Sequence, residues 1–364
     1  MKRHAMDLSL FVTVILLLVI GVMMVFSSSF YVAMSQWQDK YYFFYKDLKF
    51  ALAGMVIMIV VAMVPYRVYR KFAPMLLVVS LILLGLVLTP VGTTINGARR
   101  WIFIGSISIM PSEVAKICAI IFTAHSLTNN RNRIKKFTIG VLPYLALIGL
   151  YFGLIILQPN LSTAITIALI IMSMVFVAGA RLDQLIGLAI LGGGAFIGFA
   201  FSADYRRARV MAFLDPFQYA DGAGWQVIQS LYALGSGGLF GVGIGQSIQN
   251  KLYIPEPQND FIFATVGEEF GFIGCVLVIM LFFVLIYRGV KIAIQAPDMF
   301  GTLVATGIVA MISFQVMINI SVATSSMPVT GIPLPFISFG GSSLLILMGC
   351  MGILLNISQY TITD

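Results

Sequence analysis

The sequence predicts an all-α, polytopic integral membrane protein with ten transmembrane helices and a large extracytoplasmic loop between helices 7 and 8. Of its 364 residues, 60% are hydrophobic and 10% are charged, whereas a soluble domain carries roughly 25% charged residues. Apolar stretches close to the roughly twenty residues that cross a bilayer recur along the whole chain. We therefore expect one domain over residues 1–364, in which lipid and helix packing replace a water-excluded core.

Charged or Pro/Gly-rich breaks separate the apolar runs and define the expected helices in chain order. The first run is too long for a signal-peptide core and lacks a small-residue cleavage site, so we expect it to remain as the first span. The ten expected spans are about 8–30, 49–64, 72–90, 112–128, 138–157, 161–178, 183–202, 261–286, 300–322 and 340–358.

The distribution of Lys and Arg orients these spans. With the N-terminus inside, the basic run "NNRNRIKK" and most other cations fall on the cytoplasmic side, as the positive-inside tendency requires. An even number of spans returns the C-terminus to the cytoplasm. The loops expected outside are then about 31–48, 91–111, 203–260 and 323–339.

Five arginines in the outer loops break this pattern. Lys and Arg are normally scarce on that side, so they suggest an anionic partner such as a lipid phosphate, which a guanidinium binds bidentately. The alternatives are snorkelling side chains and an amphipathic helix that only rests in the interface. No nucleic acid is expected there. The arginines are Arg99, Arg100, Arg206, Arg207 and Arg209, and Lys251 breaks the pattern in the same way.

The cysteines and histidines form no recognisable chemical motif. Cys118, Cys275 and Cys350 lie in apolar segments without CxxC spacing, and His4 and His125 are isolated. These patterns predict packing cysteines and solvated histidines, and they give no support to a zinc site or a histidine triad. The glycine-rich "GVGIG" follows no strand, so it does not predict a nucleotide loop.

The segment "PSEVAK" has the features of a helix start, with proline in the first turn and an acid near the unsatisfied amides. Glu113 and Lys116 share one face of that helix and are costly in lipid, so they should face the interior or a watery cavity. A structural ion pair is an equally good interpretation. Trp101 lies beside the arginines and suits either the headgroup boundary or a sugar face.

All four glutamates, Glu113, Glu256, Glu268 and Glu269, occur in the outer loops or in the helices that open from them. Asp260 falls in the first turn of the eighth span, where a helix cap is the simplest interpretation. Because Glu268 and Glu269 are adjacent, they cannot both point the same way. Gly267 and Gly271 are spaced to let a neighbouring helix approach.

Long motifs in order make the chain resemble the SEDS family, which includes FtsW, RodA and SpoVE. They are "NGARRWI", "PSEVAK", "QPNLSTA", "GWQVIQSLYALGSGGLFGVGIG", "PEPQNDFIFATVGEEFGFIG" and "GIPLPFISFGGSS". The "PEPQ" and "QSLYALGSGGLFG" stretches resemble the FtsW/SpoVE branch more than RodA. Asn259 stands where the family usually has Thr, and Phe270 where Leu is usual.

The resemblance implies a peptidoglycan glycosyltransferase that polymerises lipid II into β-1,4 glycan on the outer face of the bacterial cytoplasmic membrane. Its implied partners are the growing lipid-linked glycan, a class B penicillin-binding protein (the transpeptidase) and other divisome or sporulation membrane proteins, at the septum or forespore. The family's essential aspartate maps to Asp260. Its substrate-binding residues map to Arg99, Arg100, Trp101, Glu113 and Lys116. We also expect substrate contacts from Arg206, Arg207, Arg209, Glu256 and Glu268.

A single carboxylate is sufficient for this reaction. Glycosidases need two because a sugar alkoxide leaves poorly, whereas a lipid pyrophosphate leaves without a general acid if cations stabilise its charge. Asp260 would then act as general base on the acceptor hydroxyl. A divalent cation, Mg²⁺ or Mn²⁺, is compatible with this chemistry although no ligand spacing indicates one, and no other cofactor is expected. The alternatives are a lipid II flippase and a noncatalytic division scaffold.

Overall fold

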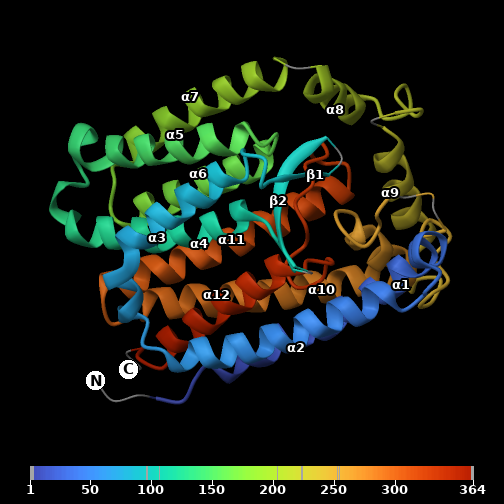
Figure 1. Cartoon of the computed structure of the whole chain (residues 1–364), viewed down its shortest axis with the longest axis horizontal. Coiled ribbons are helices and arrows are strands. Elements are labelled where there is room, and N and C mark those ends of the chain that lie inside the picture. Colours follow the sequence, from blue (N-terminus) through green and yellow to red (C-terminus); the bar gives the residue numbers. More distant parts are fainter. Residues whose placement is uncertain are drawn as a thin grey trace.

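The computed structural model describes residues 4–361 except residues 96, 106, 203, 223, 252 and 254. Most of the chain is helical, and the long helices lie side by side with both chain ends at one end of the bundle (Figure 1). Each expected span overlaps one helix of the described chain. These helices are α1 (Leu8–Trp37), α2 (Tyr42–Met63), α3 (Arg67–Leu86), α4 (Pro111–Asn129), α5 (Leu142–Ile156), α6 (Leu161–Val177), α7 (Leu182–Ala200), α10 (Ile262–Ile294), α11 (Met299–Ala323) and α12 (Ser342–Ser358).

Not all of these helices are long and apolar enough to cross a bilayer by their own composition. Within the described residues, five segments meet that standard: α1, α3, α10, α11, and α5 together with the π-helical turn that precedes it, Phe137–Val141. A short 3₁₀ turn, Arg131–Arg133, lies between α4 and that π-helical turn. The helical, membrane-type architecture is therefore confirmed, and the count of ten spans stays a prediction.

The all-α expectation is wrong for the segment between α3 and α4. Strands β1 (Thr93–Ile95), β2 (Ala98–Ile104) and β3 (Ile107–Ile109) form a small antiparallel sheet in the order β1-β2-β3. The run "RRWIFIGSISI" is rich in β-branched and aromatic residues, which favour strands. Gly97 and Gly105 have positive φ, the backbone conformation that tight hairpin turns require. The sheet lies at the end of the bundle opposite the termini (Figure 1).

The segment between α7 and α10 also contains regular structure. It forms α8 (Asp204–Leu214) and α9 (Trp225–Ser236), which lie away from the end of the bundle that carries the termini (Figure 1). The arginine-rich element expected near residue 206 coincides with α8.

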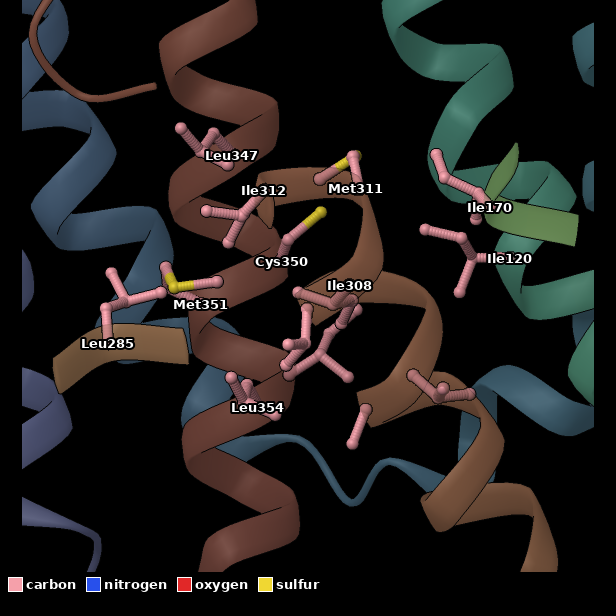
Figure 2. Packing of buried hydrophobic residues seen from close by; sticks show 14 of the residues in the cluster. Ile120, Ile170, Leu285, Ile308, Met311, Ile312, Leu347, Cys350, Met351 and Leu354 are labelled. Atoms are coloured by element: carbon pink, nitrogen blue, oxygen red, sulfur yellow. The ribbon is translucent and has the colours of Figure 1, made fainter. Parts of the chain in front are cut away.

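The core lies where α11 meets α12, α4 and α6. Ile308, Met311 and Ile312 of α11 face Cys350 and its neighbours on α12, with Ile120 and Ile170 on the far side (Figure 2). A Cβ at Gly307 would lie 2.6 Å from a methyl carbon of Ile120, so α11 and α4 are as close as a glycine allows. All three cysteines are free and buried, which confirms their packing role.

Hydrogen bonds and ion pairs at helix ends tie the termini to the bundle. Asp7 caps α1 through the Leu10 amide and forms an ion pair with Arg288 of α10 at 2.5 Å. At the start of α11, Asp298 accepts hydrogen bonds from the Tyr66 hydroxyl and from Arg67. These contacts involve residues distant in sequence and fix the ends of α1, α10 and α11.

Helix α10 is broken at Gly271, which has φ 66° and ψ −164°. The carbonyls of Glu268 and Glu269, which the break releases, accept hydrogen bonds from Val242 and Gly243 of the loop after α9. In return, Phe272 and Ile273 donate their amides to Gly238 and Leu239 of the same loop. The expected close approach is confirmed at Gly267, where a Cβ would lie 2.4 Å from Leu234. Gly271, in contrast, serves the break.

We predict that Gly271→Ala destabilises the protein. An alanine Cβ would lie 2.4 Å from the Gly241 nitrogen, and its positive φ costs about 1–3 kcal/mol before any clash is counted. Thermal unfolding in detergent, followed by circular dichroism, should show a lower Tm. Gly153→Ala in α5 is the matched control, because nothing lies within 4 Å of its Cβ position. Equal Tm values for the two variants would contradict the role given to Gly271.

Candidate functional site

A cavity of about 1110 Å³ lies among β1, β2, α8, the start of α6 and the segment before α10. The 327–332 segment after α11 closes another side. Residues that are far apart in the sequence therefore meet at this cavity. Its charged and aromatic lining residues include Arg100, Trp101, Arg206, Arg209, Glu256 and Asp260.

Asp260 does not cap α10. The helix begins at Ile262, its N-cap residue is Phe261, and no side chain caps it. The Asn259 side chain is also engaged elsewhere, because its Nδ2 donates to Glu256 Oε2 at 2.8 Å. The capping interpretation is therefore wrong, and the Asp260 carboxyl faces the cavity.

The surroundings of Asp260 make it a stronger base than an ordinary aspartate. Burial raises the pKa of its carboxyl from 3.8 to about 6, and the nearby charge of Glu256 adds to this rise. Arg209 and Arg100 oppose it, because their positive charges favour the ionised form. Gly331 lies beside the carboxyl, and a Cβ there would be 3.4 Å from Asp260 Oδ2.

Arg100 and Arg209 approach the cavity from opposite elements. Arg100 of β2 donates through Nε to the Gln158 carbonyl at 3.2 Å and through Nη2 to the Pro159 carbonyl. Arg209 of α8 donates through Nη1 to the Val329 carbonyl at 3.3 Å. These two arginines therefore bring positive charge to the wall of the cavity from two different elements. The cavity is thus suited to a ligand that carries negative charge.

Two of the five predicted arginines do not line this cavity. Arg206 and Arg209 are three residues apart and share one face of α8, whereas Arg207 is exposed on another face. Arg99 turns back toward the end of α3, where its Nη1 donates to the Leu88 and Thr89 carbonyls at 3.1 and 3.4 Å.

Glu113 and Lys116 form a buried ion pair, with Lys116 Nζ 2.8 Å from Glu113 Oε1. They line a separate, smaller cavity of about 30 Å³ between α4, α11, α12 and the 333–340 segment. This cavity is not the one that Asp260 lines. The geometry matches the structural ion pair that was the other interpretation of this spacing.

Glu268 also lies away from the cavity wall. Its carboxylate accepts hydrogen bonds from Ser247 Oγ at 2.5 Å and from the Ile248 amide at 2.8 Å. The carboxylate of Glu269 accepts instead from Ser27 of α1. The two adjacent acids thus point to different partners, as expected, and together they attach the loop after α9 to α10 and α1.

The carboxylates that line the cavity are Glu256 and Asp260. Among the described residues, no group of three or more His, Cys, Asp or Glu side chains is placed to hold a metal ion.

The sequence did not assign two segments that line the cavity and accept hydrogen bonds from its arginines. One is the start of α6, residues 159–162 within "QPNLSTA", and the other is the 327–332 segment. Both belong to motifs visible in the sequence, and both carry proline directly before or after an apolar span. These prolines indicated loops at both positions, but they did not indicate which part of the protein the loops face.

Comparison with known proteins covers almost the whole chain. The family model described as cell cycle protein, for FtsW, RodA and SpoVE, matches residues 7–363. Stage V sporulation protein E of Bacillus subtilis (strain 168) is 45% identical over 361 residues, which are 99% of each chain. The probable peptidoglycan glycosyltransferase FtsW of Trichlorobacter lovleyi is 41% identical over 97% of this chain and 93% of that protein.

Solved structures share the fold. A chain from the structure "Structural coordination of polymerization and crosslinking by a peptidoglycan synthase complex" superposes with a TM-score of 0.79 at 29% identity, over 97% of this chain and 98% of that one. Rod shape determining protein RodA of Thermus thermophilus gives a TM-score of 0.70 at 27% identity, over 99% of both chains. The resemblance read from the motifs is confirmed, and the chain belongs to the cell cycle protein family of FtsW, RodA and SpoVE.

Proposed function

We propose that this protein is a peptidoglycan glycosyltransferase that polymerises lipid II. The observation that carries the proposal is the meeting of one basic carboxylate, Asp260, with Arg100, Arg206 and Arg209 in a single cavity. A polymerase that uses a pyrophosphate-linked sugar needs a base for the acceptor and cations for the leaving group. Relatives that carry the name peptidoglycan glycosyltransferase support the same conclusion.

In this mechanism Asp260 accepts the proton of the acceptor sugar's 4-hydroxyl as its oxygen attacks the anomeric carbon of the donor. The bond from that carbon to the pyrophosphate oxygen breaks, and the arginines stabilise the charge that develops on the leaving group. Attack from the opposite side inverts the carbon, so an α-linked donor gives a β-linked glycan.

The proposed topology has ten spans in the bacterial cytoplasmic membrane, with both termini cytoplasmic and the Asp260 cavity outside. It is supported by the arrangement of the chain, because the termini lie at one end of the bundle and β1, β2 and α8 at the other (Figure 1). A class B penicillin-binding protein is the proposed partner. One structural relative comes from a peptidoglycan synthase complex, which supports an assembly of this kind.

We predict that Asp260→Asn lowers polymerisation at least about 100-fold, because a general base contributes roughly that factor or more. The amide keeps the shape of the side chain but cannot accept the proton. Gel analysis of glycan made from purified protein and lipid II measures the loss, with Asn259→Thr as the neighbouring control. Near-normal glycan synthesis by Asp260→Asn would contradict the general-base role. If the protein were instead a flippase or a scaffold, the wild-type protein would also form no glycan.

The pH dependence of the wild-type rate provides a second prediction. Because the folded pKa of Asp260 is raised to about 6, the base is ionised above that pH and becomes protonated as pH falls through it. Initial rates should therefore decline on the acid side with an apparent pKa near 6. A decline that began only near pH 4, the ordinary range of aspartate, would show that Asp260 is not held in this environment.

We predict that Arg206→Gln and Arg209→Gln each weaken binding of a short-chain lipid II analogue by roughly tenfold, from the loss of a charge-assisted contact of about 1–2 kcal/mol. Arg207→Gln is the matched control, because Arg207 has the same chemistry on the same helix but does not line the cavity. Microscale thermophoresis in detergent gives the Kd values. Equal losses for all three variants would mean that the effect is general surface charge.

For Glu113 and Lys116 we predict that a double-mutant cycle will show a structural role. Either single Ala variant leaves one buried charge unpaired and should cost about 3–5 kcal/mol, whereas the double variant should recover much of that loss together with the activity. Unfolding and polymerisation are measured on the wild type and the three variants. If stability recovers but polymerisation stays lost, the pair acts on substrate and not only on the bundle.

A further inference from the structure

Three successive backbone carbonyls before α10 are each held by the C-terminal part of the chain. The Gln258 carbonyl accepts from the Phe339 amide at 2.9 Å. The Asn259 carbonyl accepts from Ser338 Oγ at 2.6 Å, and the Asp260 carbonyl accepts from Asn319 Nδ2 at 2.9 Å.

Asn319 connects the two segments that face each other across Asp260. It is 1% exposed on α11, and its Nδ2 donates both to the Asp260 carbonyl and to the Ile332 carbonyl, the latter at 2.8 Å. Both partners are carbonyl oxygens, which only accept hydrogen bonds, and in an asparagine side chain only Nδ2 donates them. The two contacts therefore determine which way the Asn319 amide group is oriented. Asn319 therefore sets the separation between Asp260 and the segment that carries Gly331.

Ser338 repeats this arrangement one residue earlier. Its hydroxyl donates to the Asn259 carbonyl and accepts the Leu334 amide at 2.8 Å, so it also closes its own loop. The side chain is 5% exposed, which keeps water from competing for these bonds. The loop of "GIPLPFISFGG" is thereby joined to the backbone that presents the carboxylate.

We propose that Asn319 and Ser338 are positioning residues for Asp260: they hold its backbone, and this directs the carboxylate into the cavity. The inference rests on the proposed function, and it names two residues that position the general base of that function. Within the described residues, no hydrogen bond from the protein to the Asp260 carboxylate is formed, so its lone pairs are available to an incoming hydroxyl.

Holding a base through its backbone has a chemical advantage. Hydrogen bonds donated to a carboxylate stabilise its charged form and reduce its basicity. Bonds to the neighbouring carbonyls fix position without that effect. Position matters because a misplacement of about 1 Å can cost roughly a hundredfold in rate.

The test compares Asn319→Ala and Ser338→Ala with Ser230→Ala. Ser230 is also fully buried and donates to a backbone carbonyl, but that carbonyl belongs to Ala323, at 2.7 Å, and not to residues 258–260. We expect kcat per folded protein to fall on the order of tenfold to a hundredfold for the first two variants, with KM nearly unchanged. Ser230→Ala should change stability only, and Ser338→Thr, which keeps the hydroxyl, should restore much of kcat.

The pH profile adds a readout that a merely structural residue would not move. Freeing the backbone admits water to the carboxylate, so the acid limb of the kcat profile should shift to lower pH in Ser338→Ala. Unchanged kcat and an unchanged acid limb, or an equal loss in Ser230→Ala, would overturn the proposal. If Asn319→Ala does not fold, the comparison of Ser338→Ala, Ser338→Thr and Ser230→Ala tests the proposal by itself. Loss of rate in Asp260→Asn with normal Ser338→Ala would reject this inference only, whereas full activity in Asp260→Asn would reject the proposed function itself.

Discussion

The whole structure depends on the requirement that backbone N–H and C=O groups inside a bilayer find partners within the protein. Regular helices meet it by themselves. Where α10 breaks at Gly271, four groups lose their helical partners, and the loop after α9 provides four replacements. Glu268 extends this repair, because its carboxylate binds the hydroxyl and amide of the same loop. Glu268 and Glu269 thus help to hold the broken helix α10 to the loop after α9 and to α1.

A similar requirement applies to the irregular backbone around the large cavity. The segments before α6, before α10 and after α11 are irregular, and each needs partners from elsewhere in the chain. Asn319 and Ser338 meet that need for residues 258–260. Arg100 meets it for the carbonyls of Gln158 and Pro159. The cavity is therefore surrounded by backbone that other parts of the protein hold in place.

Charge is handled differently in the two cavities. In the smaller one Glu113 and Lys116 neutralise each other at 2.8 Å, and little charge remains for a ligand. Around Asp260, Arg100 and Arg209 donate hydrogen bonds to backbone carbonyls, and the pKa of the acid stays raised despite the attraction of their positive charges. A base and cations that do not cancel each other are what a transfer from a pyrophosphate donor requires.

The sequence by itself determined the helices and the family, and it singled out Asp260 as the candidate base, because apolar length, Pro and Gly breaks and long motifs are local properties of the chain. It also indicated α8 and the approach at Gly267. It missed the small sheet, since a short β-rich run inside a predicted loop gives only a weak local signal. Only the tertiary structure separated Arg206 and Arg209 from Arg207, turned Arg99 toward α3 and placed Glu113 and Lys116 in another cavity. It alone brought Asn319 and Ser338 to the backbone of Asp260, because contacts between residues about 60 and 80 positions apart depend on how helices pack and not on any local pattern.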